Sequence, residues 1–150
     1  MAVRTSDQYI RLLLKKYKNV HEKYPKSWWK DIPDTMMTNS WENYDKKINK
    51  YGVKVGTTLE FLEEKEWITK YHPYGWVEWY CDFYSGKRGK DDDRQIKRWI
   101  RTASPKSRFR RALINRIIKN KTIYSDFTIS PKIRQTLQHW GYILTKRDYK

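Results

Sequence analysis

The sequence predicts an all-α protein, a compact orthogonal helical domain of about six helices with at most a minor extended segment near residues 52–56. Three observations predict this class. Apolar residues recur at helical spacing in several separate stretches. Residues that cap helices, such as serine, threonine and aspartate, stand at the start of most of these stretches. Prolines and glycines separate one stretch from the next.

The first half of the chain is expected to form helices around aromatic side chains. They span residues 5–20, 41–50, 58–70 and 75–85. Thr57 and Glu60 have the spacing of a capping box at the start of the third helix. A loop or short helical turn held by Trp28 and Trp29 precedes the second, because prolines bound that segment. The fourth carries aromatic residues at i, i+3, i+4 and i+7, which predicts a buried stripe: Trp76, Trp79, Tyr80 and Phe83.

The second half is expected to form two basic helices over residues 92–103 and 108–119, followed by a last helix. Asp91, Asp92 and Asp93 would cap the first of these, and Ser107 the second. The last helix would begin with Ser130 as the N-cap and proline at its first position. The final Lys-Arg-Asp-Tyr-Lys is expected to fray. We treat residues 1–150 as one domain, aromatic-cored over 1–86 and basic over 87–150.

The positive charge of the chain is unevenly distributed. The net charge is +16, from 33 basic and 17 acidic side chains. Residues 1–86 hold 14 basic and 12 acidic residues, whereas residues 87–150 hold 19 and 5. A field of this sign attracts polyanions such as DNA or RNA. The simpler interpretation, that lysine keeps an aromatic-rich protein soluble, does not explain the asymmetry.

Cysteine content and hydropathy narrow the expected setting of the protein. The single cysteine, Cys81, excludes an internal disulfide and a cysteine-rich zinc site. It lies among aromatic residues, so burial as a small apolar side chain is expected. No apolar run reaches the length of a transmembrane helix, and the N-terminus lacks a signal-peptide pattern. We therefore expect an intracellular protein with no membrane partner.

The two basic helices predict a surface that binds nucleic acid. Each has an apolar stripe and a face rich in arginine and lysine, and a short Ser-Pro turn joins them, as in a helix–turn–helix unit. Contacts to phosphates should dominate, with an asparagine available for an adenine edge. The predicted contact residues are Lys87, Arg88, Lys97, Arg98, Arg101, Arg108, Arg110, Arg111, Asn115, Arg116 and Lys119. DNA is favoured over RNA, and the same pattern also fits two amphipathic helices with solvated cations.

Two other functions compete with this one. A basic, aromatic-rich helical domain could be a structural or assembly protein, such as a virion or packaging component, that binds an acidic protein surface. A metal-dependent nuclease is the third hypothesis: Glu78 and Asp82 at i, i+4 would hold a metal with Asp91–Asp93, and His72 would act as a base. Capping and ion pairs with Arg88 or Arg94 explain these carboxylates more simply. We expect no catalytic residues, no metal and no cofactor.

Part of the sequence resembles a domain of large double-stranded DNA viruses of eukaryotes, also present in algal and fungal proteins. The resemblance lies in FLEEKEWI, HPYGWVEWYCDFYSGKR and DDDRQIKRW between Leu59 and Trp99, and in ISPKIRQTLQHWGYIL. It covers about half of the chain and excludes the first 55 residues. No activity or site residue carries over from it. The resemblance implies a viral or virus-derived protein that acts near DNA, in the nucleus, a viral factory or the virion.

Overall fold

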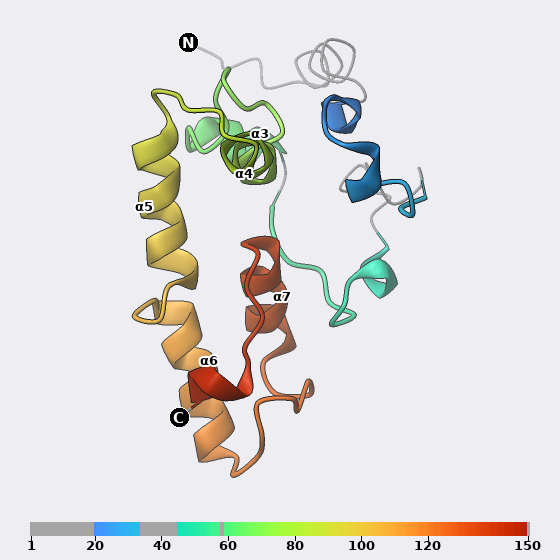
Figure 1. Cartoon of the computed structure of the whole chain (residues 1–150). Coiled ribbons are helices and arrows are strands. Elements are labelled where there is room, and N and C mark those ends of the chain that lie inside the picture. Colours follow the sequence, from blue (N-terminus) through green and yellow to red (C-terminus); the bar gives the residue numbers. More distant parts are fainter. Residues whose placement is uncertain (1–19, 34–44, 58, 150) are drawn as a thin grey trace. The chain divides into compact units, whose positions relative to one another are not determined.

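The computed structural model describes residues 20–33, 45–57 and 59–149, whose helices are drawn in Figure 1. Within these ranges the protein is all-α: α-helices and short 3-10 helices occur, and no strand. A single isolated bridge between Thr69 and His72 is the only β-type pairing recorded there. The helix expected over residues 5–20, apart from its last residue, and the first four residues of that at 41–50 lie outside the described residues.

The chain divides into two compact units. Unit 1 comprises Met1–Tyr44 and Thr57–Gly86, and unit 2 comprises Asp45–Gly56 and Lys87–Lys150. The division after Gly86 coincides with the change from aromatic to basic sequence. That the whole chain forms one domain stays a prediction.

In unit 1, helix α3 spans Leu59–Glu64 and is shorter than the helix expected over 58–70. Glu66 adopts a φ of 55°, a left-handed conformation that ends a helix. The amide of Trp67 then donates to the carbonyl oxygen of Leu62 at 2.8 Å. No glycine or proline marks this position in the sequence, so the early end was not predictable from breaker residues.

Helix α4 spans Trp76–Tyr84, close to the expected 75–85. Gly75 and Gly86 flank it with φ values of 80° and 90°, which glycine adopts without the strain of a side chain. Trp79 is buried, and the ring of Phe83 lies 5.0 Å from it between centroids. This helix therefore supplies the aromatic centre of unit 1.

One part of the expected stripe on α4 is wrong. Tyr80 was expected in the core, but it is 46% exposed, whereas the carboxylate residue Glu78 is buried. The reason is a lysine from another segment: the Nζ of Lys23 lies 2.7 Å from Oε1 of Glu78 and compensates its charge. Periodicity alone cannot reveal a partner 55 positions away.

Residues 20–33 form two short 3-10 helices, η1 at Val20–Lys23 and η2 at Lys26–Trp28. Trp29 lies against His21 with 4.7 Å between ring centroids, and its Nε1 donates to the carbonyl oxygen of Tyr24 at 3.3 Å. The tryptophans thus anchor a short helical segment, as expected for this region.

Unit 2 contains three α-helices within the described residues. Helix α5 spans Asp92–Ala103 and helix α6 spans Arg108–Lys119, at the predicted residues. Helix α7 spans Pro131–His139 and packs against α6 (Figure 1). The buried core between them is aliphatic, with partly buried aromatic residues around it. Its members are Ala103, Leu113, Ile117, Leu137 and Leu144.

The segment 45–56 belongs to unit 2 and lies against α7. It contains the 3-10 helix η3, Lys46–Ile48, where part of an α-helix was expected. The amide of Tyr51 donates to Oε1 of Gln135 on α7 at 3.2 Å. Residues 52–56 form no strand, since Gly52 and Gly56 turn the backbone at positive φ. The extended segment expected here is therefore absent as an element.

One expectation for the C-terminal part is confirmed and one is wrong. Ser130 is the N-cap of α7 and proline follows it, as predicted, but Ser130 has a φ of 52°, and its Oγ accepts from Arg116 and makes no capping hydrogen bond. The last residues do not fray within the described range, because Lys146–Tyr149 form the 3-10 helix η4. The hydroxyl of Tyr149 donates to the carbonyl oxygen of Thr122 at 3.2 Å. The C-terminal segment is thus part of the packed unit.

Candidate nucleic-acid interface

The positive charge of the protein belongs almost wholly to unit 2. Its sequence holds 23 basic and 6 acidic residues, so its net charge is +17. Unit 1 holds 10 basic and 11 acidic residues, a net charge of −1. The two structural units therefore differ more in net charge than the two parts of the sequence divided at residue 86. The reason is that four lysines of residues 45–56 belong to the basic unit. Unit 2 is the part of the chain that can attract a polyanion.

Helix α5 presents two cations on the side opposite to its buried residues. Gln95 and Ala103 are buried, and Lys97 and Arg101 lie about half a turn away from them and are exposed. Their positions follow from the helical period of 3.6 residues. No ion pair is recorded for either cation within the described residues, so both side chains are accessible to phosphates.

Helix α6 carries a continuous polar stripe. Ser107 caps the helix by accepting a hydrogen bond from the amide of Arg110 at 3.2 Å. Leu113 and Ile117 fix the buried face of the helix. The opposite face holds exposed residues at i, i+3, i+7 and i+11, which the helical period places in one row. We call these residues the α6 stripe: Arg108, Arg111, Asn115 and Lys119.

Helices α5 and α6 contact each other within unit 2. Helix α6 follows α5 along the chain after a short turn (Figure 1). The helix–turn–helix arrangement expected for the two helices stays a prediction.

Arg98 is a less accessible cation than expected. Its guanidinium lies over the ring of Trp140, 5.1 Å from the centroid, and its Nη1 donates to Oε1 of Gln95 at 2.8 Å. Burial lowers its pKa, and the nearby charge of Arg94 lowers it further. Arg98 thus joins α5 to the segment after α7 and presents only part of its charge to solvent.

Arg110 was expected on the outward face of α6, and this is wrong. The residue is only 6% exposed. Its Nη2 donates to Oδ1 of Asp148 at 2.8 Å, and its Nη1 donates to the carbonyl oxygen of Ala103 at 3.2 Å. The ring of Tyr142 lies 4.0 Å from the guanidinium carbon. Arg110 therefore stabilises the turn between α5 and α6 and is not available to a ligand.

The other predicted contact residues are exposed. Lys87 and Arg88 lie in the segment before α5, where Nη1 of Arg88 donates to the carbonyl oxygen of Lys87 at 2.7 Å. Arg116 is exposed near the end of α6, and its Nη1 donates to Oγ of Ser130 at 3.0 Å. Exposed lysines outside the predicted set also belong to unit 2. They are Lys46, Lys47, Lys50, Lys90, Lys106, Lys121, Lys132 and Lys146.

Sequence reasoning missed a second buried arginine, Arg134 on α7. Its Nε donates to the carbonyl oxygen of Ile129 at 2.8 Å and its Nη2 to that of Asp126 at 2.9 Å. The ring of Phe127 lies 5.4 Å from its guanidinium carbon. Arg134 therefore closes the loop before α7. The sequence carried no signal for it, because the acceptors are backbone carbonyls.

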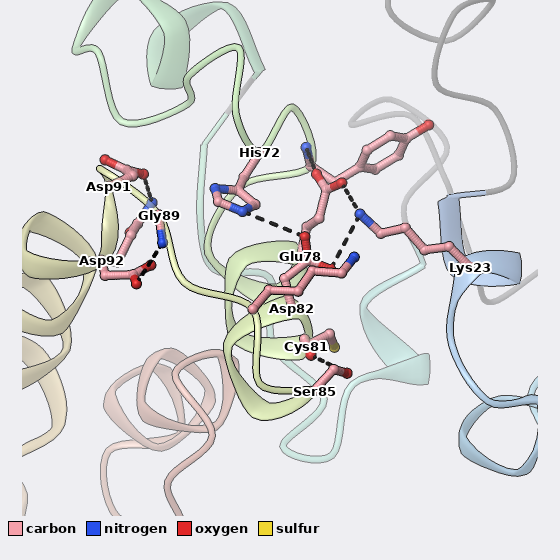
Figure 2. Close-up of polar contacts among 12 residues, drawn as sticks. Lys23, His72, Glu78, Cys81, Asp82, Ser85, Gly89, Asp91 and Asp92 are labelled. Atoms are coloured by element: carbon pink, nitrogen blue, oxygen red, sulfur yellow. Dashed lines mark hydrogen bonds and ion pairs between the residues drawn. The ribbon is translucent and has the colours of Figure 1, made fainter.

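The carboxylates of α4 form an ion-pair cluster in unit 1 (Figure 2). Lys23 contacts Oε1 of Glu78 at 2.7 Å and Oδ1 of Asp82 at 3.5 Å. The second oxygen of Glu78 accepts from the amide of Tyr74, and His72 lies 3.7 Å from Asp82. Lys23 is thus a partner of both carboxylates that the sequence did not indicate, and the ion pairs expected with Arg88 or Arg94 stay a prediction. In the described part of the chain, no group of three or more metal-binding side chains is present.

The aspartates at the start of α5 do not act together as side-chain caps. Asp91 is buried and accepts from Nη2 of Arg94 and from Nε2 of Gln95, each at 2.9 Å. Asp92 accepts from the amide of Gly89 at 2.8 Å (Figure 2). These bonds fix the entry of the chain into α5. Asp91–Asp93 belong to unit 2, whereas Glu78 and Asp82 belong to unit 1.

Among the helices of the described ranges, none is long and apolar enough to cross a lipid bilayer. No protein-family model matches the sequence, and it matches no curated protein and no solved structure.

Proposed function

We propose that this chain binds nucleic acid, DNA more readily than RNA, through the exposed cations of α5 and α6. The observation that carries the proposal is the α6 stripe together with Lys97 and Arg101. These cations lie opposite the buried faces of their helices and have no carboxylate partner among the described residues. Unit 2 as a whole has 23 basic residues against 6 acidic ones.

The expected mode of binding is contact with phosphates. Arg108, Arg111 and Lys119 present charges along about three turns of a helix, a spacing that follows a nucleic-acid backbone rather than a single base. Asn115 is the one residue of the stripe suited to an adenine edge. Direct readout of sequence should therefore be weak, and the affinity should fall steeply as salt increases.

A charge reversal on α6 tests the proposal. We expect the double variant Arg108→Glu, Arg111→Glu to lose at least about tenfold in affinity for a labelled duplex, because two phosphate contacts become repulsive. The slope of log affinity against log salt should decrease by about 2. Fluorescence anisotropy over a salt series measures both quantities, and circular dichroism checks that the helices remain.

A matched control separates the α6 stripe from the charge of the unit. The variant Lys46→Glu, Lys47→Glu changes the net charge by the same amount in the same unit, but at exposed residues of η3. It should retain most of the affinity. Equal losses in the two variants would show that the proposed surface is not the binding surface.

The remaining parts of the proposal concern architecture and setting. We infer a domain of about six helices without enzymatic activity, located in the nucleus, a viral factory or the virion. The resemblance to proteins of large DNA viruses supports this setting. An assembly role with an acidic protein partner is the competing function, and a salt titration of binding to random DNA separates the two.

A further inference from the structure

Unit 1 carries a row of aromatic side chains that are not fully buried in its core. Residues 76, 80 and 84 lie at i, i+4 and i+8, so they share one side of α4. Tyr80 and Tyr84 are exposed, the latter by 69% of its surface, and Trp28 of η2 is 41% exposed. We call the five residues of this line the aromatic row: Trp76, Tyr80, Tyr84, Trp28 and Tyr24.

Each ring of the aromatic row contacts the next. Trp76 and Tyr80 are stacked with 5.1 Å between centroids, and Tyr84 lies 6.3 Å from Tyr80. Trp28 meets Tyr84 at 5.6 Å and stacks on Tyr24 at 5.8 Å. These separations are those of interacting aromatic pairs. The row therefore joins α4 to the segment 20–33 as one surface.

The inner end of the aromatic row is held in place by hydrogen bonds. The hydroxyl of Tyr24 donates to Oδ1 of Asp82 at 2.9 Å and to the carbonyl oxygen of Glu78 at 3.1 Å. Lys23, the residue before Tyr24, contacts the carboxylates of Glu78 and Asp82. These bonds hold one end of the aromatic row in place. A ligand that stacks on the exposed rings therefore does not have to pay for ordering that segment.

We infer that the aromatic row stacks on unpaired bases, so that the chain prefers single-stranded nucleic acid or duplex with an unpaired stretch. This inference rests on the proposed function, because unit 1 alone has a net charge of −1 and the attraction for phosphates comes from the charge of the whole chain. Rings on which successive bases stack, combined with a basic surface, are the usual elements of single-strand binding. Lys26 and Lys30 are exposed beside Trp28, against one exposed carboxylate in that turn, Asp31.

The residue types of the aromatic row favour binding to the bases of a nucleic acid over binding to an apolar protein partner. Exposed positions on this side of α4 are tyrosines, with Val77 the one aliphatic exception within the helix. A chain with a net charge of +16 selects a polyanion. A single strand is the polyanion that also offers flat aromatic groups.

The test uses ligands that differ only in their bases. The wild-type protein and its variants are titrated with three labelled ligands of about 16 nucleotides: oligo(dT), an abasic strand and a duplex. The variant Tyr80→Leu, Tyr84→Leu removes two rings and keeps apolar side chains. We expect it to lose about 5- to 30-fold in affinity for oligo(dT), the effect of about one stacked base. Its affinity for the abasic strand and its salt slope should not change.

Two controls make the result specific. The variant Tyr80→Phe, Tyr84→Phe keeps the rings and should keep the preference for oligo(dT). The variant Tyr71→Leu makes the same change at an exposed tyrosine of unit 1 outside the aromatic row and should have no effect. Circular dichroism of each variant confirms that α4 is retained.

Two failures are distinguishable. Equal affinity of the wild type for oligo(dT), the abasic strand and the duplex overturns the stacking inference and leaves the proposed function standing. Absence of binding to all three ligands overturns the proposed function, and the stacking inference with it. A loss that is equal for all three ligands in the leucine variant also overturns the stacking inference.

Discussion

The guanidinium of Arg110 and the carboxylate of Asp148 form an ion pair that joins α6 to the C-terminal 3-10 helix. The Nη2 of Arg110 lies 2.8 Å from Oδ1 of Asp148, with side chains exposed by 8% and 24%. The amide and the hydroxyl of Thr145 both donate to the other oxygen, Oδ2, of Asp148. Each oxygen of the carboxylate thus has a partner, which is the condition under which a partly buried pair is tolerated.

Removal of the carboxylate should destabilise unit 2. We expect Asp148→Ala to lower the free energy of unfolding by about 2–4 kcal/mol, because the buried cation of Arg110 loses its partner. Urea denaturation followed by circular dichroism measures the change. Asp93→Ala is the matched control, since it removes a carboxylate at an exposed position of α5 and should cost less than about 1 kcal/mol. Equal effects of the two substitutions would contradict this role of Asp148.

The sequence predicted the bounds of α5 and α6 but not the role of Arg110. The bounds are local properties, set by the Ser-Pro break, the cap at Ser107 and the apolar period. The burial of the Arg110 side chain depends on its bond to Asp148, which is 38 positions away in the chain. A long side chain at the edge of the polar face can turn to either side, and only tertiary packing decides which.

Acid should weaken the same ion pair. Burial alone would raise the pKa of Asp148, but hydrogen bonds from Thr145 and the charge of Arg110 outweigh it, so the pKa is lowered. A carboxyl group with a folded pKa below its unfolded value of about 4 stabilises the protein above that pH. The stabilisation is lost as the pH falls through the folded pKa.

The pH prediction concerns the difference between two proteins. The gap in unfolding free energy between the wild type and Asp148→Asn should be constant from pH 7 to pH 5 and should narrow below about pH 4. Urea midpoints measured at intervals from pH 7 to pH 2.5 give this gap. A gap that stays constant down to pH 2.5 would show that the pKa of Asp148 is not lowered by folding.

The aliphatic core of unit 2 predicts that alanine substitutions at two positions of α6 differ strongly in their effect on stability. Leu113 is almost fully buried in the core cluster, whereas Ile118 is 56% exposed. Leu113→Ala should cost about 2–5 kcal/mol through lost burial and a residual cavity. Ile118→Ala, which shortens an apolar side chain on the same helix, should cost less than about 1 kcal/mol. Chemical denaturation of both variants decides whether α6 is oriented as described.

The candidate interface was predictable only in part. The cations of the α6 stripe follow from the helical period, because the aliphatic residues of the helix fix which side faces the core. The aromatic row did not follow from the period. The spacing of Trp76, Tyr80 and Phe83 predicted a buried stripe, but Glu78 is buried with Lys23 as its partner, and Tyr80 is exposed. Contacts between distant segments decided these cases.

A comparison of double and triple charge reversal separates binding from folding on α6. Arg108→Glu, Arg111→Glu changes exposed residues and should leave the helical content and the urea midpoint near those of the wild type. Addition of Arg110→Glu places a carboxylate beside Asp148 and should cost at least about 4 kcal/mol, because the new charge is buried without a partner. If the triple variant were as stable as the double one, Arg110 would be free to face solvent.

The thiol of Cys81 offers a test of the packing around α4. Burial raises the pKa of Cys81, and the charge of Asp82 raises it further, whereas Lys23 lowers it. Because the thiolate is the reactive form, alkylation by iodoacetamide in the folded protein should be slow at neutral pH. The rate should reach half of its maximum at a pH above about 8.5, the value of an unperturbed thiol. The same chain in concentrated urea is the control, and we expect it to react about fivefold faster or more at pH 8. Equal rates in the two states would mean that α4 and the segment 20–33 do not shield this thiol.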